Sequence, residues 1–136
     1  MGIRVGGLMF GLALACVSCV GVAKPGVREL VGPWRVSGPQ TSTARIDLRE
    51  DGSCSADPAF VSFAAACNAR PTEPAPVVRS CHWGLQNAAG ADEIQVVLDS
   101  SAGFLALKMG AERLVGPGVL RLQGLCVDQS PYRLSP

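Results

Sequence analysis

Cysteines are the residues of this 136-residue chain with the most distinctive chemistry. Four of them, Cys54, Cys67, Cys81 and Cys126, lie outside the apolar N-terminal segment. An even set of cysteines in so small a domain predicts two disulfide bonds in an oxidising compartment, and the spacing leaves three pairings open. None of the four has a second cysteine two to four residues away, and His82 is the single histidine. We therefore expect no metal site and no cofactor.

Acid–base catalysis would have to pass through His82 or through a carboxylate with a shifted pKa. His82 alternates with Cys81 and Trp83, and this spacing predicts that the imidazole faces solvent. The carboxylates fall in turns or at outward strand positions, where we expect them to be solvated: Asp47, Glu50, Asp51, Asp92, Glu93 and Asp99. The sequence also has no metalloprotease helix motif, nucleophile elbow or phosphate-binding glycine loop. We expect a protein that is not an enzyme.

The N-terminal segment, residues 1–23, predicts a secretory signal. Arg4 precedes an apolar stretch, and the small residues Gly21 and Ala23 precede Lys24, which is the three-part pattern of such segments. A membrane-spanning helix over Val5–Ala23 is the alternative, because the stretch is just long enough to cross a bilayer. No basic cluster follows it to stop transfer, and the signal interpretation is favoured.

Cys16 and Cys19 in this segment have the spacing of a redox motif, yet an apolar leader cannot build a thioredoxin-like site. The same residues partly match a lipoprotein cleavage motif. Cleavage before Cys19 would leave only the four cysteines expected to pair, whereas cleavage after Ala23 would leave a soluble protein. Both outcomes stay open. A lipid on Cys19 is the only link to a membrane that we expect.

Charge excludes one class of partner. Without residues 1–23, which hold one basic and no acidic side chain, the 12 basic residues become 11 and match the 11 acidic ones. A near-neutral domain without a basic stripe along the sequence has little electrostatic attraction for phosphate backbones. We expect no nucleic-acid partner.

Strict alternation of apolar and polar residues predicts short half-buried strands. The predicted strands cover residues 34–37, 44–49, 54–56, 81–86, 93–99, 104–109, 113–115 and 120–125. Turn signals separate them, at 50–52, 87–91, 100–103, 110–111 and 116–118. We predict a mainly β domain over residues 24–136, an antiparallel meander of seven or eight strands that forms a small barrel, with a sandwich as the alternative.

One short helix is predicted within this pattern, at about residues 58–69. Asp57 is a good N-cap, Pro58 suits the first helical position, and Phe60, Phe63 and Cys67 share one face. Such a helix could plug one end of a barrel or act as a lid over a pocket. The three prolines that follow, Pro71, Pro74 and Pro76, predict an extended, solvent-facing connector.

Trp34 and Trp83 occupy apolar strand faces. Together with Phe60 and Phe63 they are the candidates for lining a ligand site in the barrel mouth. Large aromatic residues on inward faces are more often part of the core. Both interpretations remain open at this stage.

Gly32-Pro33-Trp34 resembles the Gly-x-Trp start of lipocalin-type barrels. A wider pattern, made of Ile46-Asp47-Leu48, Asp51–Ala56, Cys81–Gly84 and Leu122–Gly124, is similar to small exported bacterial proteins, often lipoproteins, of unassigned function. The resemblance covers about residues 30–127. It implies a cell-envelope protein with a barrel-like fold, and it transfers no catalytic residue. The chain falls short of a full lipocalin.

These observations predict a non-enzymatic binding protein of the cell envelope, of the periplasm or of the secreted fraction. The partner would be a protein, bound through Phe104, Leu125 or the connector 71–76, or a small apolar molecule carried inside the barrel in the manner of lipocalins. A secreted protease inhibitor of the small β-barrel type is the alternative, with residues 24–29 as the arm that enters the protease. A hydrolase would need His82 paired with a carboxylate.

Overall fold

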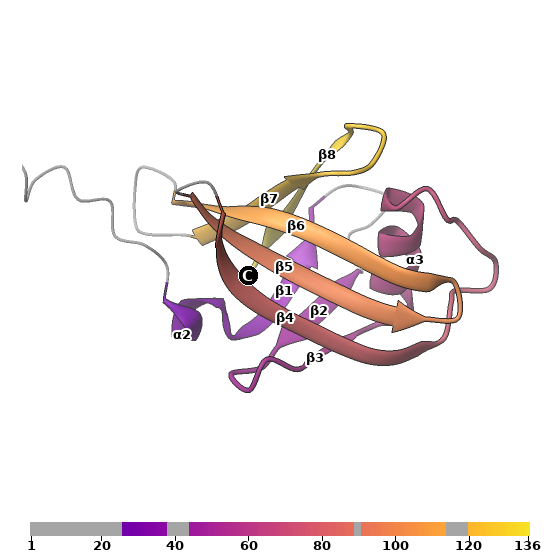
Figure 1. Cartoon of the computed structure of the whole chain (residues 1–136), viewed down its shortest axis with the longest axis horizontal. Helices are drawn as coiled ribbons and strands as arrows, with labels where there is room; N and C mark the ends of the chain where they lie inside the picture. The colour runs from indigo at the N-terminus through magenta and orange to yellow at the C-terminus, as the bar shows by residue number, and fades with distance from the viewer. Residues whose placement is uncertain (1–25, 38–43, 89–90, 114–119) are drawn as a thin grey trace, which may run out of the picture.

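The computed structural model describes residues 26–37, 44–88, 91–113 and 120–136. They form one antiparallel sheet and two α-helices (Figure 1). The helices are α2 (Val27–Leu30) and α3 (Pro58–Cys67). The strands are β1 (Gly32–Val36), β2 (Arg45–Leu48), β3 (Cys54–Ala56), β4 (Val78–Ala88), β5 (Ala91–Ser100), β6 (Gly103–Arg113), β7 (Leu120–Leu125) and β8 (Pro131–Ser135).

The sheet curls into a nearly closed barrel. Its strand order is β3-β2-β1-β8-β7-β6-β5-β4, so β1 pairs with β8 and the two ends of the order are β3 and β4. Those ends meet at one isolated bridge, Ser53 with His82, and the Trp83 N–H donates to the Gly52 carbonyl at 2.9 Å. The predicted barrel is confirmed, and the sandwich alternative is wrong because all eight strands belong to one sheet.

Alternating side chains from the strands fill the interior. Trp34 and Val36 on β1, for example, are buried while Arg35 between them is exposed. The predicted inward faces of β2, β5 and β6 are confirmed by the same pattern, because residues two apart on a strand share one face. The fully buried large side chains are Leu30, Ile46, Leu48, Phe60, Ile94, Val96, Leu98, Leu105, Met109, Leu122 and Leu134.

Helix α3 begins where the sequence predicts and ends two residues earlier. The Asp57 carboxylate accepts the Phe60 N–H at 2.8 Å, and Pro58 occupies the first turn. At the other end the Asn68 side chain donates to the Ala64 carbonyl at 2.8 Å, and Ala69 adopts a left-handed φ of 58°. That conformation cannot continue a helix, and α3 therefore stops at Cys67.

Two disulfides hold different parts of the fold. Cys54–Cys81 joins β3 to β4, beside the single bridge at the barrel seam. Cys67–Cys126 joins the last residue of α3 to the loop after β7. The four cysteines predicted to pair do so, and of the three pairings left open the fold selects this one. Disulfides persist in oxidising compartments outside the cytosol, and the pair indicates export to such a compartment.

The predicted turn at Gly110-Ala111 is wrong, because β6 continues to Arg113. Gly110 pairs with Glu93 on β5 and with Gln123 on β7, so ladder partners on both sides hold this glycine in an extended strand. Asn87 and Ala88 on β4 pair with Asp92 and Ala91 on β5, so Asn87, Ala88 and Ala91 also belong to strands instead of a turn. Residues 114–118 of the predicted short strand and turn, and the whole segment 1–23 with Cys16, Cys19 and Ala23, lie outside the described residues.

Strand β8 was not expected from the sequence, although Tyr132 and Leu134 are buried and Arg133 between them is exposed. Helix α2 was also not expected. The predicted solvent-facing connector needs a correction at Pro76, which is buried. The reason is local: the Val77 N–H donates to Ser101 Oγ at 3.0 Å and the Ser101 N–H donates to the Val77 carbonyl at 2.9 Å, which ties the connector to the β5–β6 turn.

Candidate functional site

Three large apolar side chains are exposed around the C-terminal end of α3. Phe104, Leu125 and Val127 retain 68%, 59% and 64% of their accessible surface. We call this set the α3-end patch. Phe104 and Leu125 were predicted contact residues, whereas Val127 was not, and its apolar character within the polar stretch that precedes β8 was the signal available. Large apolar side chains that stay exposed are candidates for an interaction site.

The backbone beneath the patch is held at several points. The Val127 N–H donates to the Cys67 carbonyl at 2.9 Å, next to the Cys67–Cys126 disulfide. On the other side, Asn68 Nδ2 donates to the Ala106 carbonyl at 3.2 Å and the Ala106 N–H donates to Asn68 Oδ1 at 3.4 Å. Ala106 lies two residues after Phe104 on the same face of β6. The end of α3 therefore links both halves of the patch.

Tyr132 supports the patch from below. Its ring lies over Gly124, and its hydroxyl donates to the Lys108 carbonyl on β6 at 3.0 Å. It also contacts Phe63 edge to face at 5.4 Å between ring centroids, and Phe63 contacts Phe60 in the same manner at 5.7 Å. Burial raises the pKa of the Tyr132 hydroxyl, which stays a neutral donor.

The described part of the chain has open depressions beside β7 and β8 and beside α3. One, of about 320 Å³, is lined by Gln123, Gly124, Leu125, Pro131, Tyr132 and Arg133 and adjoins the patch at Leu125. The other, of about 840 Å³, lies between α3 and the connector and is lined by Ser62 and residues 71–75. The first combines apolar walls with an arginine, as ligand and peptide sites often do.

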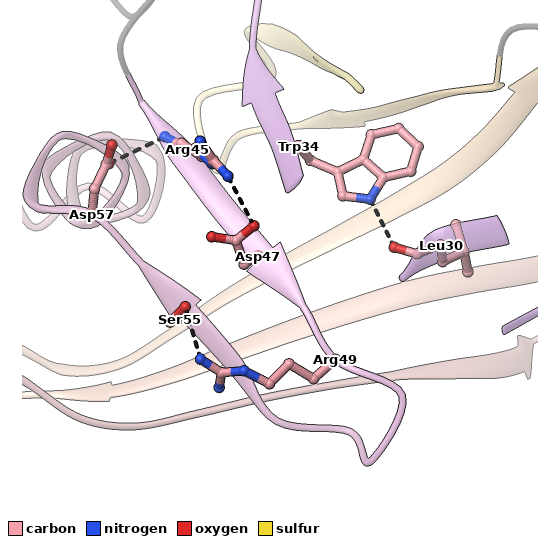
Figure 2. Close-up of polar contacts among 7 residues, drawn as sticks. All are labelled: Leu30, Trp34, Arg45, Asp47, Arg49, Ser55 and Asp57. Atoms are coloured by element: carbon pink, nitrogen blue, oxygen red, sulfur yellow. Dashed lines mark hydrogen bonds and ion pairs between the residues drawn. The ribbon is translucent and has the colours of Figure 1, made fainter. Parts of the chain in front are cut away.

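The predicted interior candidates belong to the core. Trp34 and Trp83 are 2% and 7% exposed. Trp34 Nε1 donates to the Leu30 carbonyl at 2.8 Å (Figure 2), and Trp83 Nε1 donates to the Arg49 carbonyl at 2.7 Å. Phe60 is fully buried, and Phe63 is half-buried against it. The indole donors are satisfied within the protein, and α3 packs as part of the core.

His82 is exposed, as predicted, at the barrel seam. The carboxylates with a resolved shift lie in turns. The Ser53 hydroxyl and N–H donate to Asp51 at 2.6 and 2.9 Å and hold the pKa of that carboxyl below its usual value. The Ser130 hydroxyl and N–H do the same for Asp128. Both groups stabilise turns, because each carboxylate accepts a bond from the residue two positions on.

Among the described ranges, no group of three or more histidine, cysteine, aspartate or glutamate side chains is placed to hold a metal ion. Nor does any helix in those ranges have the length and apolar character needed to cross a membrane. No protein-family model, curated protein or solved structure matches the chain. The barrel is thus the part of the lipocalin-like resemblance that the fold supports.

Proposed function

We propose that this chain is a non-enzymatic interaction protein of an oxidising, exported compartment, and that it binds a partner protein through the α3-end patch. The observation that carries the proposal is the exposure of Phe104, Leu125 and Val127 on a backbone fixed by the Cys67–Cys126 disulfide. Side chains presented on a rigid backbone lose less conformational freedom on binding, and more of the burial energy remains as affinity.

The partner expected at this surface has an apolar pocket for an aromatic anchor. Phe104 projects from the outer face of β6, and interface energy concentrates on such aromatic side chains. Asp99 lies opposite Phe104 on β5 and adds a charged rim. This arrangement of an apolar centre with a polar edge is typical of protein–protein interfaces.

The test uses Phe104→Ser combined with Leu125→Ser. Full-length protein carrying this pair should lose capture of its partner after cross-linking in its own host, while its melting temperature stays close to that of the parent. Val27→Ser is the matched control, since Val27 is 43% exposed on α2 and its loss removes apolar surface elsewhere. Equal capture by the parent and the double variant would reject the proposed surface. Light scattering on the purified protein separates a second copy of the chain from a different partner.

Export and anchoring complete the proposal. We propose that residues 1–23 are removed as a signal segment, with the mature chain starting at a lipidated Cys19 or after Ala23. An intact mass of the protein from its host distinguishes a diacylglycerol-modified Cys19 from a start at Lys24. A mass that retains residues 1–23 would reject the signal segment.

The two alternative functions, an apolar-ligand carrier and a protease inhibitor, need structural features that differ from those described. An apolar-ligand carrier needs space where Phe60 is fully buried and where the tryptophan donors are already satisfied. A protease inhibitor with an arm at residues 24–29 needs an extended segment, yet Val27–Leu30 is helical and Leu30 is buried. The partner-protein proposal requires neither change.

A further inference from the structure

The outer face of the barrel gathers arginines that are far apart in the sequence. Arg35 on β1, Arg45 on β2, Arg121 on β7 and Arg133 on β8 all occupy positions between buried neighbours, so their side chains point outward. No basic stripe is visible along the sequence, because these residues belong to four separate segments. The strand order β2-β1-β8-β7 places the four strands side by side.

The registers of β8 with β1 and with β7 place the arginines of this cluster around Ser135. Arg35 is directly opposite Ser135 across the β1–β8 pair, and Arg133 lies two residues before it on the same face. The β7–β8 register, Leu122 with Leu134, places Arg121 beside Ser135 on its other side. Directly opposed side chains have Cβ atoms about 5 Å apart. Three guanidinium groups can therefore reach one point above Ser135.

Two serine hydroxyls, from Ser37 and Ser135, lie among these arginines. Ser37 Oγ and Ser135 Oγ lie 3.1 Å apart, and the Ser37 N–H donates to the Arg133 carbonyl at 2.8 Å. The two hydroxyls are thus held between Arg35 and Arg133. One of the two hydroxyls donates its proton to the other, so the pair can donate one hydrogen bond to an outside acceptor.

Two of the four arginines have an acidic neighbour, since Glu112 lies directly opposite Arg121 across the β6–β7 pair and Asp47 lies beside Arg45. Asp47 pairs with the Arg45 guanidinium at 3.4 Å, and Asp57 Oδ1 accepts the backbone N–H of Arg45 (Figure 2). The same Asp57 oxygen accepts the backbone N–H of Phe60. Within the described part of the chain, Arg35 and Arg133 form no ion pair.

The cluster also carries two local costs. Arg35 lies directly opposite Arg45, a like-charge arrangement that destabilises a sheet. The Nε atom of Arg121 is buried without an acceptor in the described residues. A bound anion would offset the first of these costs, because its charge opposes that of Arg35.

We propose that Arg35, Arg121 and Arg133, with the Ser37 and Ser135 hydroxyls, form a binding site for a phosphate group. A phosphate carries several acceptor oxygens and up to two charges, and it matches several guanidinium forks at once. A single carboxylate would leave most of these donors unused. The site is on the outer sheet face and does not depend on the α3-end patch.

The experiment titrates inorganic pyrophosphate into the full-length protein by calorimetry in a chloride buffer of constant ionic strength. We expect saturable one-to-one binding that weakens as salt increases. Arg133→Gln and Arg35→Gln should each weaken binding about tenfold, since each removes one charge-assisted contact. Arg79→Gln, which removes an equal charge from an exposed position on β4, should leave affinity unchanged.

Vesicles distinguish the source of the phosphate. Binding to phosphatidylcholine vesicles that contain phosphatidic acid, lost in Arg35→Gln with Arg133→Gln, would assign the site to a lipid headgroup. Binding to pyrophosphate alone would assign it to a soluble phosphate compound. The proposal is overturned if neither probe binds, if Arg79→Gln weakens binding as much as Arg133→Gln, or if an oligonucleotide binds in place of pyrophosphate.

Discussion

At the α3 end of the barrel a ten-residue helix is held by a side-chain N-cap, a fully buried Phe60 and a disulfide, whereas at the α2 end a four-residue helix has no side-chain cap. Leu30 is the buried residue of α2, and its backbone carbonyl accepts a hydrogen bond from the indole Nε1–H of Trp34. The two ends lie far apart along the strands in Figure 1. Cys67–Cys126 ties α3 covalently, whereas α2 is held by the burial of Leu30 and by the Trp34 indole hydrogen bond.

The two ends also differ in the side chains that they expose to solvent. At the α3 end Phe104, Leu125 and Val127 retain 68%, 59% and 64% of their accessible surface. At the α2 end Val27 and Val31 retain 43% and 38%, beside an exposed Arg28–Glu50 pair at 3.9 Å. Exposed pairs of this kind contribute little to stability. The comparison shows that the firm support lies under the apolar surface, where a rigid display favours binding.

The largest expected effect is on the free energy of unfolding, when the buried side chain of each helix is truncated. Phe60→Ala should lower the free energy of unfolding by about 3–5 kcal/mol, because it leaves a large cavity where α3 meets the barrel. Leu30→Ala at the other end should cost about 2–4 kcal/mol. Urea denaturation of both variants measures the difference. A greater loss for Leu30→Ala would reverse the comparison and make α2 the more important closure.

Removal of each disulfide comes next. Cys54→Ser with Cys81→Ser, and Cys67→Ser with Cys126→Ser, should each cost about 2–4 kcal/mol. The second bond closes a span of 59 residues against 27 for the first, and the chain-entropy model makes it the larger contribution by about 0.7 kcal/mol.

Amide hydrogen exchange locates the damage from each removal. Removal of Cys54–Cys81 should make amide exchange faster than in the parent at β3 and β4. Removal of Cys67–Cys126 should make it faster at α3 and Val127. The same exchange pattern in both variants would show that the two bonds do not hold separate regions.

A smaller effect is expected at Gly124, below the α3-end patch. A Cβ at this position would collide with the Lys108 carbonyl and with the Tyr132 hydroxyl. Gly124→Ala should therefore cost about 1–3 kcal/mol. Gly110→Ala is the matched control, because Gly110 is exposed on the adjacent strand with no neighbouring atom within 4 Å of an added Cβ. Equal stability of the two variants in thermal unfolding would show that Tyr132 can move aside.

The smallest expected effect is on the pH dependence of stability. One aspartate contributes at each end of the barrel, Asp51 at the α2 end and Asp128 at the α3 end. The folded-state pKa values of Asp51 and Asp128 are lowered by serine donors. Their contribution is therefore present above the ordinary aspartate value of about 3.9 and is lost as pH falls through the folded values. Carbon-detected NMR titration should show both carboxyls ionising below that value. Ordinary titration of either group would contradict the turn assignment.

Sequence patterns predicted much of the barrel because alternation is local. Ile46, Leu98 and Leu107 were assigned to the interior from neighbours two residues away, and all three are buried. The N-cap at Asp57 was also readable, since cap and helix are adjacent. Gly110 misled the prediction, because a glycine signals a turn unless strands on both sides hold it extended, and those partners are distant in the sequence.

The sequence by itself determined the strand faces, the start of α3, the exposure of Phe104 and Leu125, and the presence of four cysteines able to pair. Only the tertiary structure decided which cysteines pair, where the seam lies, and that Asn68 and Tyr132 tie α3 and β8 to β6. It also decided that Arg35, Arg121 and Arg133 surround Ser135. The physical reason is that side-chain alternation depends on adjacent residues, whereas strand register brings together residues almost a hundred positions apart.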